Sequence, residues 1–452
     1  MFVAPWVSYN IYKTNSETRA YISDSQMHTE ILIEGISAEL WDKIASKKSR
    51  DELLSFLIEN NSSESDLYEF IDELVSNNLL IDNRCNNSEI VEYSPITYNR
   101  GDSLKEQISY YDEMDEWLTN NHFLSSLMLE LTYKCNEKCV HCYNNKDSFI
   151  DEIKFVDIKS VIDEAKNLGV NAVTLSGGEC TLAKDFFKIS QYIREKKMKL
   201  NIYSNGQSFY DNPLLLDKVI SLYPTRFSFS LYSMNAEIHD SITGIKGSHL
   251  KTLSIIKKLK AKNVDVEIKC FLTRLNIDNF LDVVKFAKEN DIAVTLDSVF
   301  LYNKNRNNYD IQATKEQLLE YYKARKNITD FIPLTDPHSL SDEYLNYRLC
   351  KGGISQVCVS PNLELFPCPS LKIKLGDLKE KSLNEIFKDN NPNAPLSMIR
   401  KLKRNNLVEC YKKEYCKYCS YCAGNAMAEN GFLKKANILC TNAKSLYYAN
   451  KK

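Results

Sequence analysis

The sequence predicts an α/β protein: a partial, TIM-like (β/α)6 barrel between a small N-terminal winged-helix domain and a C-terminal cysteine-rich domain. Three observations carry this prediction. Strand-like apolar runs alternate with helical patterns between residues 125 and 302, short alternating segments precede helical patterns in residues 1–95, and eight of the fourteen cysteines fall between Cys350 and Cys440. A chain of 452 residues is also too long to fold around a single hydrophobic core, so more than one domain is expected.

The N-terminal prediction covers residues 1–95. The segments VSYNIYKT, RAYISDS and TEILIEG alternate apolar and polar residues as small strands do. Two helical patterns follow, SRDELLSFLIEN with Ser49 as a cap and ESDLYEFIDELVSNN, and then the apolar strand LLID. This order outlines a winged helix, although a structural appendage fits the pattern equally well. Residues 96–124 are polar and are interpreted as a linker.

The barrel prediction covers residues 125–302. The strand-like runs are LMLELTY, NAVTLSGG, LNIYSNG, RFSFSLY, VDVEIKCFLT and AVTLDSVF, with helical patterns between them. Strands that alternate with helices indicate a parallel sheet, whose chemistry lies at the carboxyl ends of the strands. Residues 303–349 are expected to form a helical connection. Residues 350–452 begin with the hairpin-like VCVSPNLELFPC and are expected to be held by metal rather than by a large core.

Composition excludes several classes of function. The formal net charge of −2 gives no support to nucleic-acid binding, and no apolar run is long enough to span a membrane. The N-terminus lacks the pattern of a signal peptide, so a cytoplasmic location is expected. In that reducing compartment the cysteines are expected to bind metals or clusters rather than form disulfides.

A cysteine triplet follows the first barrel strand. Cys135, Cys139 and Cys142 have the spacing C-x3-C-x2-C, and so short a loop can present three thiolates to one face of a cluster. A four-iron cluster held by three cysteines leaves one iron open to a small chelating ligand. The alternatives are a zinc site completed by His141 and unligated core cysteines.

Polar and glycine residues end the next three strands. Gly177 and Gly178 allow close backbone approach to a ligand, and the carboxylate of Glu179 can accept from an ammonium group. Asn205 and Ser230 end the third and fourth strands, where a turn or strand-end hydrogen bond explains them equally well.

The triplet and the SGGEC run together resemble the radical S-adenosylmethionine (SAM) superfamily. The resemblance implies a [4Fe-4S] cluster whose open iron binds SAM, and one-electron cleavage of SAM to a 5'-deoxyadenosyl radical. It also implies that Gly177, Gly178 and Glu179 hold the methionyl amino group. Ser230 and Asn205 would lie near the ribose or carboxylate, and His141 near the adenine. Family members commonly have proline where this chain has Cys180, which is interpreted as a tolerated substitution.

The cysteine-rich tail resembles the SPASM extension of peptide-modifying radical enzymes. The resemblance implies one or two auxiliary iron–sulfur clusters. Two four-iron clusters need eight cysteine ligands, and the tail offers seven because Cys358 is interpreted as structural. We expect one cluster, farther from the barrel, on Cys410, Cys416, Cys422 and Cys440. A second would use Cys350 and Cys368, with Cys419 as a possible third ligand.

Several residues of the tail do not fit this ligand set. Asn425 stands where relatives often have another cysteine. Cys358, Cys85 and Cys270 are interpreted as structural. A zinc ribbon is the alternative for the whole tail.

Residues 1–95 resemble the PqqD-like leader-recognition module of maturases of ribosomally made peptides. The resemblance implies a precursor peptide whose leader adds to a sheet edge, and an external electron donor such as flavodoxin or ferredoxin. The function predicted is peptide maturation by hydrogen abstraction, forming a sactipeptide-type thioether. Three other reactions remain as alternatives: epimerisation, carbon–carbon cross-linking, and serine or cysteine oxidation as in sulfatase maturation. An alternative of another class is a non-catalytic iron–sulfur or zinc protein that binds peptide or senses redox state. The sequence identifies no catalytic acid or base.

Overall fold

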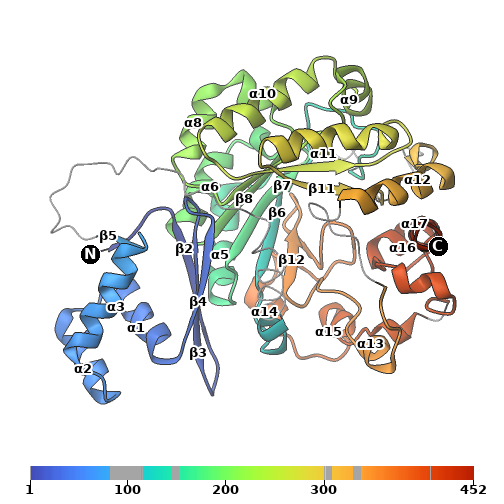
Figure 1. Ribbon diagram of the computed structural model, residues 1–452. Helices are drawn as coiled ribbons and strands as arrows, with labels where there is room; N and C mark the ends of the chain where they lie inside the picture. Colours follow the sequence, from blue (N-terminus) through green and yellow to red (C-terminus); the bar gives the residue numbers. More distant parts are fainter. Residues whose placement is uncertain are drawn as a thin grey trace.

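The structure is a computed structural model that describes residues 2–81, 114, 116–144, 152–299, 301, 308–328, 337–407 and 409–451. Within these residues the centre of the molecule is a nine-stranded sheet in the order β11-β10-β9-β8-β7-β6-β12-β13-β14. Figure 1 shows the helices packed along this sheet, with the N-terminal segment on one side and the C-terminal segment on the other. Cys85 and most of the predicted linker lie outside the described residues.

Six neighbouring strands of this sheet are parallel, which confirms the predicted barrel strands. Each pairs in parallel with the next along the chain, so their carboxyl ends meet at one edge of the sheet. The strands are β6 (Ser126–Thr132), β7 (Ala172–Gly177), β8 (Lys199–Ser204), β9 (Arg226–Ser230), β10 (Val266–Phe271) and β11 (Ala293–Asp297).

Helices cover the outer face of the barrel strands. Alternate strand residues such as Leu175, Ile202 and Ile268 are fully buried against helix residues in one core, because side chains along a strand alternate between its two faces. The intervening helices are α5 (Phe155–Asn167), α6 (Phe186–Glu195), α7 (Gln207–Asp211), α8 (Pro213–Ile220), α9 (Ala236–Thr243), α10 (Ser248–Ala261) and α11 (Phe280–Glu289). The opposite face of the strands is left for polar side chains and forms the barrel interior.

The N-terminal segment contains a three-stranded antiparallel sheet of β2 (Val7–Lys13), β3 (Thr18–Asp24) and β4 (Thr29–Glu34). The helices α1 (Gly35–Ala45), α2 (Arg50–Glu59) and α3 (Glu64–Ser76) follow, and β1 (Phe2–Val3) pairs with β5 (Leu80–Ile81). Ser49 caps α2 in a capping box, as its position in the sequence indicates. The helical patterns in the sequence do not predict helix α1. It forms because Ala38 and Trp41 are fully buried in the core under the sheet.

The N-terminal sheet is fixed to the barrel by buried polar contacts. The Tyr12 hydroxyl donates to the carbonyl of Gly169 at 3.0 Å, and the Tyr9 amide donates to the carbonyl of Lys197 at 2.9 Å. The Arg194 guanidinium, 6% exposed, donates to the carbonyl of Pro5 at 2.9 Å and also to the hydroxyl of Ser8. The β2 side of the sheet therefore faces the barrel. Among the described strands, β4 pairs only with β3, so its other edge has no strand partner.

The C-terminal segment extends the barrel sheet. The predicted hairpin forms from β12 (Gln356–Val359) and β13 (Glu364–Phe366), and β14 (Gly376–Asp377) pairs with β13. β12 also pairs in parallel with β6, with Cys358 opposite Met128. The sequence does not predict this pairing. The remaining helices are α12 (Lys315–Arg325), α13 (Asp342–Asn346), α14 (Leu383–Phe387), α15 (Pro395–Arg400), α16 (Ala423–Glu429) and α17 (Asn437–Asn450). The cysteine-rich tail thus begins beside the first barrel strand.

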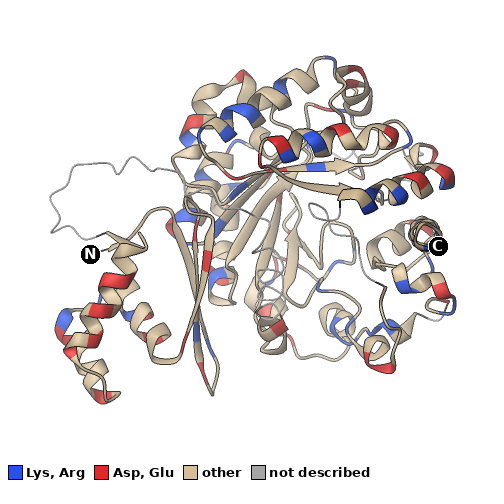
Figure 2. Ribbon diagram, viewed as in Figure 1, with Lys and Arg blue, Asp and Glu red and all other residues tan. Residues whose placement is uncertain are grey.

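Charged residues of both signs are interspersed along the helices, while the central strands carry few of them (Figure 2). This pattern agrees with the nearly neutral net charge of −2. Among the described residues, no helix combines the length and apolar character that crossing a membrane requires.

Candidate active site

The cysteine triplet lies on a compact loop at the carboxyl end of β6. The thiols of Cys135, Cys139 and Cys142 are all partly exposed. The loop rests on the end of α9, because the amides of Lys138 and Val140 donate to backbone carbonyls there at 2.8 and 2.9 Å. Within the loop the Cys142 amide donates to the Cys139 carbonyl at 3.2 Å. The three thiols are therefore held on one short, hydrogen-bonded loop at the barrel mouth.

The end of β7 crosses directly over the start of this loop. The amide of Gly178 donates to the carbonyl of Thr132 at 2.7 Å, and the amide of Glu179 donates to the carbonyl of Lys134 at 2.8 Å. A Cβ on Gly177, whose φ is +131°, would lie 2.3 Å from the Thr132 oxygen, and one on Gly178 would lie 2.3 Å from the Lys134 oxygen. Only glycine allows two backbones to approach this closely.

Glu179 is a buried carboxylate surrounded by donors. Its side chain accepts from the Ser204 hydroxyl at 2.9 Å, the Thr181 hydroxyl at 2.7 Å and the Asn205 amide at 2.8 Å. Burial is the main effect on this carboxyl and raises its pKa, while these hydrogen bonds oppose the rise. The residue is 1% exposed. The carboxyl ends of β7 and β8 together therefore hold one oriented acidic group beside the triplet.

The other predicted SAM contacts occupy the same edge of the sheet. The Asn205 side chain donates to Asn136 in the triplet loop at 2.6 Å. The His141 ring lies 4.8 Å from the Tyr232 ring and 5.2 Å from the Phe271 ring, and burial lowers its pKa to about 4. Ser230 is the last residue of β9 and is partly buried. Asn205 is thus placed against the triplet loop, and His141 packs between aromatic rings as a neutral imidazole.

Two polar residues near the triplet were missed by the sequence patterns. Glu137 is 3% exposed and accepts from the Gln207 side chain at 2.7 Å and from the Cys139 thiol at 3.1 Å. Nothing in the order of residues links Gln207 to the triplet loop, because β8 and α7 bring it there only in the folded chain. Cys180, in contrast, is fully buried and its thiol donates to the carbonyl of Tyr203 at 3.3 Å, so it packs inside the barrel.

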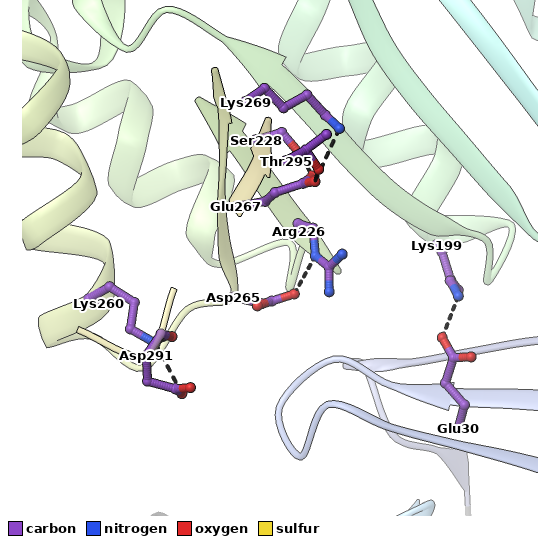
Figure 3. Close-up of polar contacts among 10 residues, drawn as sticks. All are labelled: Glu30, Lys199, Arg226, Ser228, Lys260, Asp265, Glu267, Lys269, Asp291 and Thr295. Atoms are coloured by element: carbon purple, nitrogen blue, oxygen red, sulfur yellow. Dashed lines mark hydrogen bonds and ion pairs between the residues drawn. The ribbon is translucent and has the colours of Figure 1, made fainter. Parts of the chain in front are cut away.

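The barrel interior below this edge is polar. Glu267 of β10 accepts from the hydroxyls of Ser228 and Thr295 at 2.7 and 2.6 Å and from the Lys269 ammonium at 3.1 Å (Figure 3). The ammonium of Lys269 also lies 4.9 Å from the centre of the Tyr203 ring. At the opposite end of the strands Lys199 pairs with Glu30 of the N-terminal sheet at 2.5 Å. The interior therefore offers hydrogen-bonding groups to a polar substrate, and the N-terminal sheet covers its far end.

Four cysteines of the tail line one cavity of about 140 Å³, and this set differs from the expected cluster grouping by one residue. Burial raises the pKa of the Cys419 thiol to about 12, and the neighbouring thiols of Cys440, Cys410 and Cys416 add to the rise. Cys422 does not line this cavity. Cys419, which directly follows the 3-10 turn over Glu414–Tyr418, lines the cavity, whereas Cys422, which directly precedes α16, does not.

The other three cysteines predicted as tail ligands, Cys350, Cys368 and Cys422, do not line this cavity. Burial raises the pKa of the Cys368 thiol to about 11, and the thiols of Cys422 and Cys350 add to the rise. Four of the seven tail cysteines therefore line the cavity and three do not. Asn425 lies in α16, is 8% exposed and has an unpaired Oδ1. Cys358 and Cys270 are buried in the sheet, as expected for structural thiols.

The donor sets agree with iron–sulfur ligation. Thiolate is the usual protein ligand of such clusters, and each cysteine binds its own iron. Within the described residues, no three His, Cys, Asp or Glu side chains lie close enough to share one metal ion. The assignment of Cys135, Cys139 and Cys142 to one cluster, and of the tail cysteines to others, stays a prediction.

Comparison with known proteins identifies the barrel. Residues 129–289 match the model of the Radical SAM superfamily. An AdoMet-dependent heme synthase of Methanosarcina barkeri is 27% identical over 329 residues, covering 67% of this chain and 92% of the relative. The antilisterial bacteriocin subtilosin biosynthesis protein AlbA of Bacillus subtilis is 26% identical over 313 residues, covering 65% of each chain. The crystal structure of Streptococcus suis SuiB bound to precursor peptide SuiA superposes with a TM-score of 0.59 and 15% identity, covering 97% of this chain and 99% of SuiB.

Proposed function

The chain belongs to the radical SAM superfamily, and from this premise we propose that it modifies a ribosomally made precursor peptide by forming a thioether from a cysteine sulfur to an α-carbon. A [4Fe-4S] cluster and SAM are the cofactors of this superfamily, and when bound they supply a radical that abstracts hydrogen. The chain's own residues bind these cofactors, orient the peptide and exclude water from the barrel mouth. We further propose a cytoplasmic location and an external electron donor such as flavodoxin or ferredoxin.

The division of the tail cysteines is the observation that carries the thioether proposal. Cys410, Cys416, Cys419 and Cys440 line one cavity, and Cys350, Cys368 and Cys422 do not line it. We propose that these three bind a separate cluster. A four-iron cluster on three cysteines leaves one iron for an outside ligand. A cysteine of the peptide is a suitable ligand, since thiolate is what the other irons already bind. This arrangement would hold the sulfur that forms the new bond.

The test is anaerobic reconstitution followed by incubation with SAM, reductant and the peptide encoded beside the gene. We expect 5'-deoxyadenosine and a peptide that has lost two hydrogen atoms per cross-link, with fragmentation placing the bond between cysteine sulfur and an α-carbon. A peptide whose cysteines are replaced by serine should remain unmodified. Modification of that serine peptide, or a product of unchanged mass, would reject the thioether and favour carbon–carbon linkage or epimerisation.

The N-terminal sheet supports a peptide substrate. The β4 edge has no strand partner among the described residues, and the sheet is fixed to the barrel through Tyr12, Arg194 and Lys199. A leader peptide that adds to this edge would gain main-chain hydrogen bonds while its core segment remains tethered near the barrel. SuiB, whose structure was solved with its precursor peptide, matches this chain over its N-terminal part as well as its barrel.

Strand addition predicts an alternating effect of N-methylation in the leader. Successive amides of a strand point to opposite sides, so methylating one alternate set should break the bonds to β4 while the other set should be tolerated. Loss of two or three such bonds should weaken binding about 30- to 150-fold, since each is worth about 1 kcal/mol. Fluorescence anisotropy of labelled leader measures the affinity. Equal effects of the two methylated sets would reject strand addition.

Glu179 is proposed to bind the methionyl ammonium of SAM. The variant E179Q should therefore weaken SAM binding about 10- to 100-fold, because hydrogen bonds to charged groups are worth about 1.5–3 kcal/mol.

The same carboxyl predicts a pH dependence of SAM binding. Burial raises the pKa of Glu179 above its ordinary 4.5. On acidification the carboxylate should therefore take up a proton, and SAM affinity should fall, at a higher pH than for an exposed glutamate. E179Q should lack this decline. Equilibrium dialysis with labelled SAM measures both effects, and E195Q on the exposed face of α6 is the matched control. An E179Q protein with ordinary affinity would remove Glu179 from the site.

Heme formation is a second candidate, supported by the similarity to the Methanosarcina barkeri heme synthase. That match covers 92% of the relative but 67% of this chain, so a large part of this chain has no counterpart in it. The peptide proposal accounts for the extra segment. Incubation of the reconstituted protein with an iron porphyrin in place of the peptide separates the two, since porphyrin conversion without peptide modification would favour heme formation.

A further inference from the structure

Glu130 is a fully buried carboxylate with three charged or hydroxyl donors. It lies on β6 and is 0% exposed. The Tyr143 hydroxyl donates to Oε1 at 3.0 Å, while the Tyr133 hydroxyl and the Lys372 ammonium each donate to Oε2 at 3.0 Å. A buried charge is costly unless it is paired and hydrogen-bonded, and both oxygens of Glu130 meet that condition.

The two tyrosines bracket the cysteine triplet. Tyr133 precedes Cys135 by two residues, and Tyr143 directly follows Cys142. One carboxylate on a rigid central strand therefore holds both ends of the loop that carries the first cluster. Removing this anchor would release both flanks of the loop at once.

Lys372 connects this anchor to the cysteine tail. It lies in the segment between β13 and β14, four residues after Cys368, whose sulfur accepts from the amide of Leu371 at 3.3 Å. The Lys372 ammonium also lies 5.1 Å from the Phe366 ring centre and 5.9 Å from each of the Tyr133 and Tyr143 ring centres. This ammonium thus stands where the triplet loop and the Cys368 segment meet, with aromatic rings around it.

We propose that Glu130 and Lys372 are positioning residues whose opposite charges set the reduction potential of the triplet cluster and hold the Cys368 segment beside it. The proposal rests on the cluster assigned to Cys135, Cys139 and Cys142. The potential of an iron–sulfur cluster depends on nearby net charge, and charges act strongly where water is excluded. Neither residue needs to touch the cluster to act in this way.

The charges predict shifts of opposite sign. K372M leaves the carboxylate uncompensated, which favours the oxidised cluster and should lower its reduction potential. E130Q leaves the ammonium uncompensated and should raise the potential. The double variant E130Q/K372M should return toward the value of the unmodified protein, because both charges are gone.

Potentiometric titration of the full-length reconstituted protein, followed by electron paramagnetic resonance, measures these shifts. The signal that changes on addition of SAM identifies the triplet cluster among the others. K374M is the matched control, because Lys374 lies two residues away on the same segment and pairs with Glu364 and Asp377 at 2.9 Å rather than with Glu130. Its potential should be unchanged.

Shifts of the same sign in K372M and E130Q, or no shift in either with iron content intact, would overturn the proposal. If E130Q loads no iron, comparison of K372M with K374M still tests the proposal. A lower reduction potential in K372M alone supports the charge pair, and equal potentials in the two variants reject it. Absence of any SAM-responsive signal in the unmodified protein would instead contradict the cluster assignment itself. The two failures are therefore distinguishable.

Discussion

Replacing Cys135, Cys139 and Cys142 together by alanine is expected to abolish 5'-deoxyadenosine formation and to remove about four iron atoms per chain. The three thiols are partly exposed and belong to a loop held by backbone hydrogen bonds to α9, so the fold should survive the change. Iron analysis and an assay for SAM cleavage under reducing conditions measure the two losses. The tail cysteines line separate sites and should keep their iron.

The matched control is C270A. Cys270 is 2% exposed and its thiol donates to the Tyr232 carbonyl at 3.5 Å, so it is a packed residue of the barrel. Its replacement should cost about 1 kcal/mol of stability, as single core changes often do, and leave iron content unchanged. If the triple variant keeps all its iron while C270A loses some, the ligand assignment is wrong.

Replacing Gly178 by alanine is expected to reduce SAM binding and cleavage by about 100-fold, the loss that a displacement of about 1 Å in a reacting site can cause. The added Cβ would lie 2.3 Å from the Lys134 oxygen and 2.5 Å from the Tyr133 oxygen, both in the backbone. The end of β7 would have to move away from the triplet loop, which would weaken the bond from the Glu179 amide to the Lys134 carbonyl. Overpacking of this kind also costs about 1–3 kcal/mol of stability.

G247A separates this clash from the general cost of replacing a glycine. Gly247 has a φ of +84°, and a Cβ there would meet no atom within 4 Å. The variant should lose about 1–2 kcal/mol through backbone strain alone and should still bind and cleave SAM. Isothermal titration with SAM and thermal unfolding of both variants measure the contrast. Equal SAM affinity in G178A and the unmodified protein would show that the crossing of β7 over the loop does not shape the site.

Local patterns in the sequence were sufficient for the barrel and for the first ligand loop. Strands such as 126–132 and 172–177 carry alternating residues whose outward set is apolar, and helices begin at caps such as Ser49 that hydrogen-bond within four residues. Cys135, Cys139 and Cys142 are close in sequence, so their proximity in space follows from loop length alone. Such features depend on neighbours along the chain.

Contacts between distant segments could not be predicted in the same way. Helix α1 depends on Trp41 meeting the N-terminal core, Glu137 meets Gln207 only when β8 lies beside the triplet loop, and β12 joins β6 across more than two hundred residues of chain. The same holds for Cys419 and Cys422. They are three residues apart, yet of the two Cys419 alone lines the cavity shared with Cys410, Cys416 and Cys440.

The sequence by itself therefore determined the order of the barrel strands, the short loop that carries three thiols and the glycine–glutamate turn, because short-range spacing and periodicity encode them. Only the tertiary structure decided that Cys419 rather than Cys422 lines the cysteine cavity, that Lys372 reaches Glu130 at 3.0 Å, and that the N-terminal sheet covers the barrel's far end. The physical reason is that these contacts join residues far apart in the chain. Their energies depend on burial and charge pairing, which exist only after the sheet has assembled.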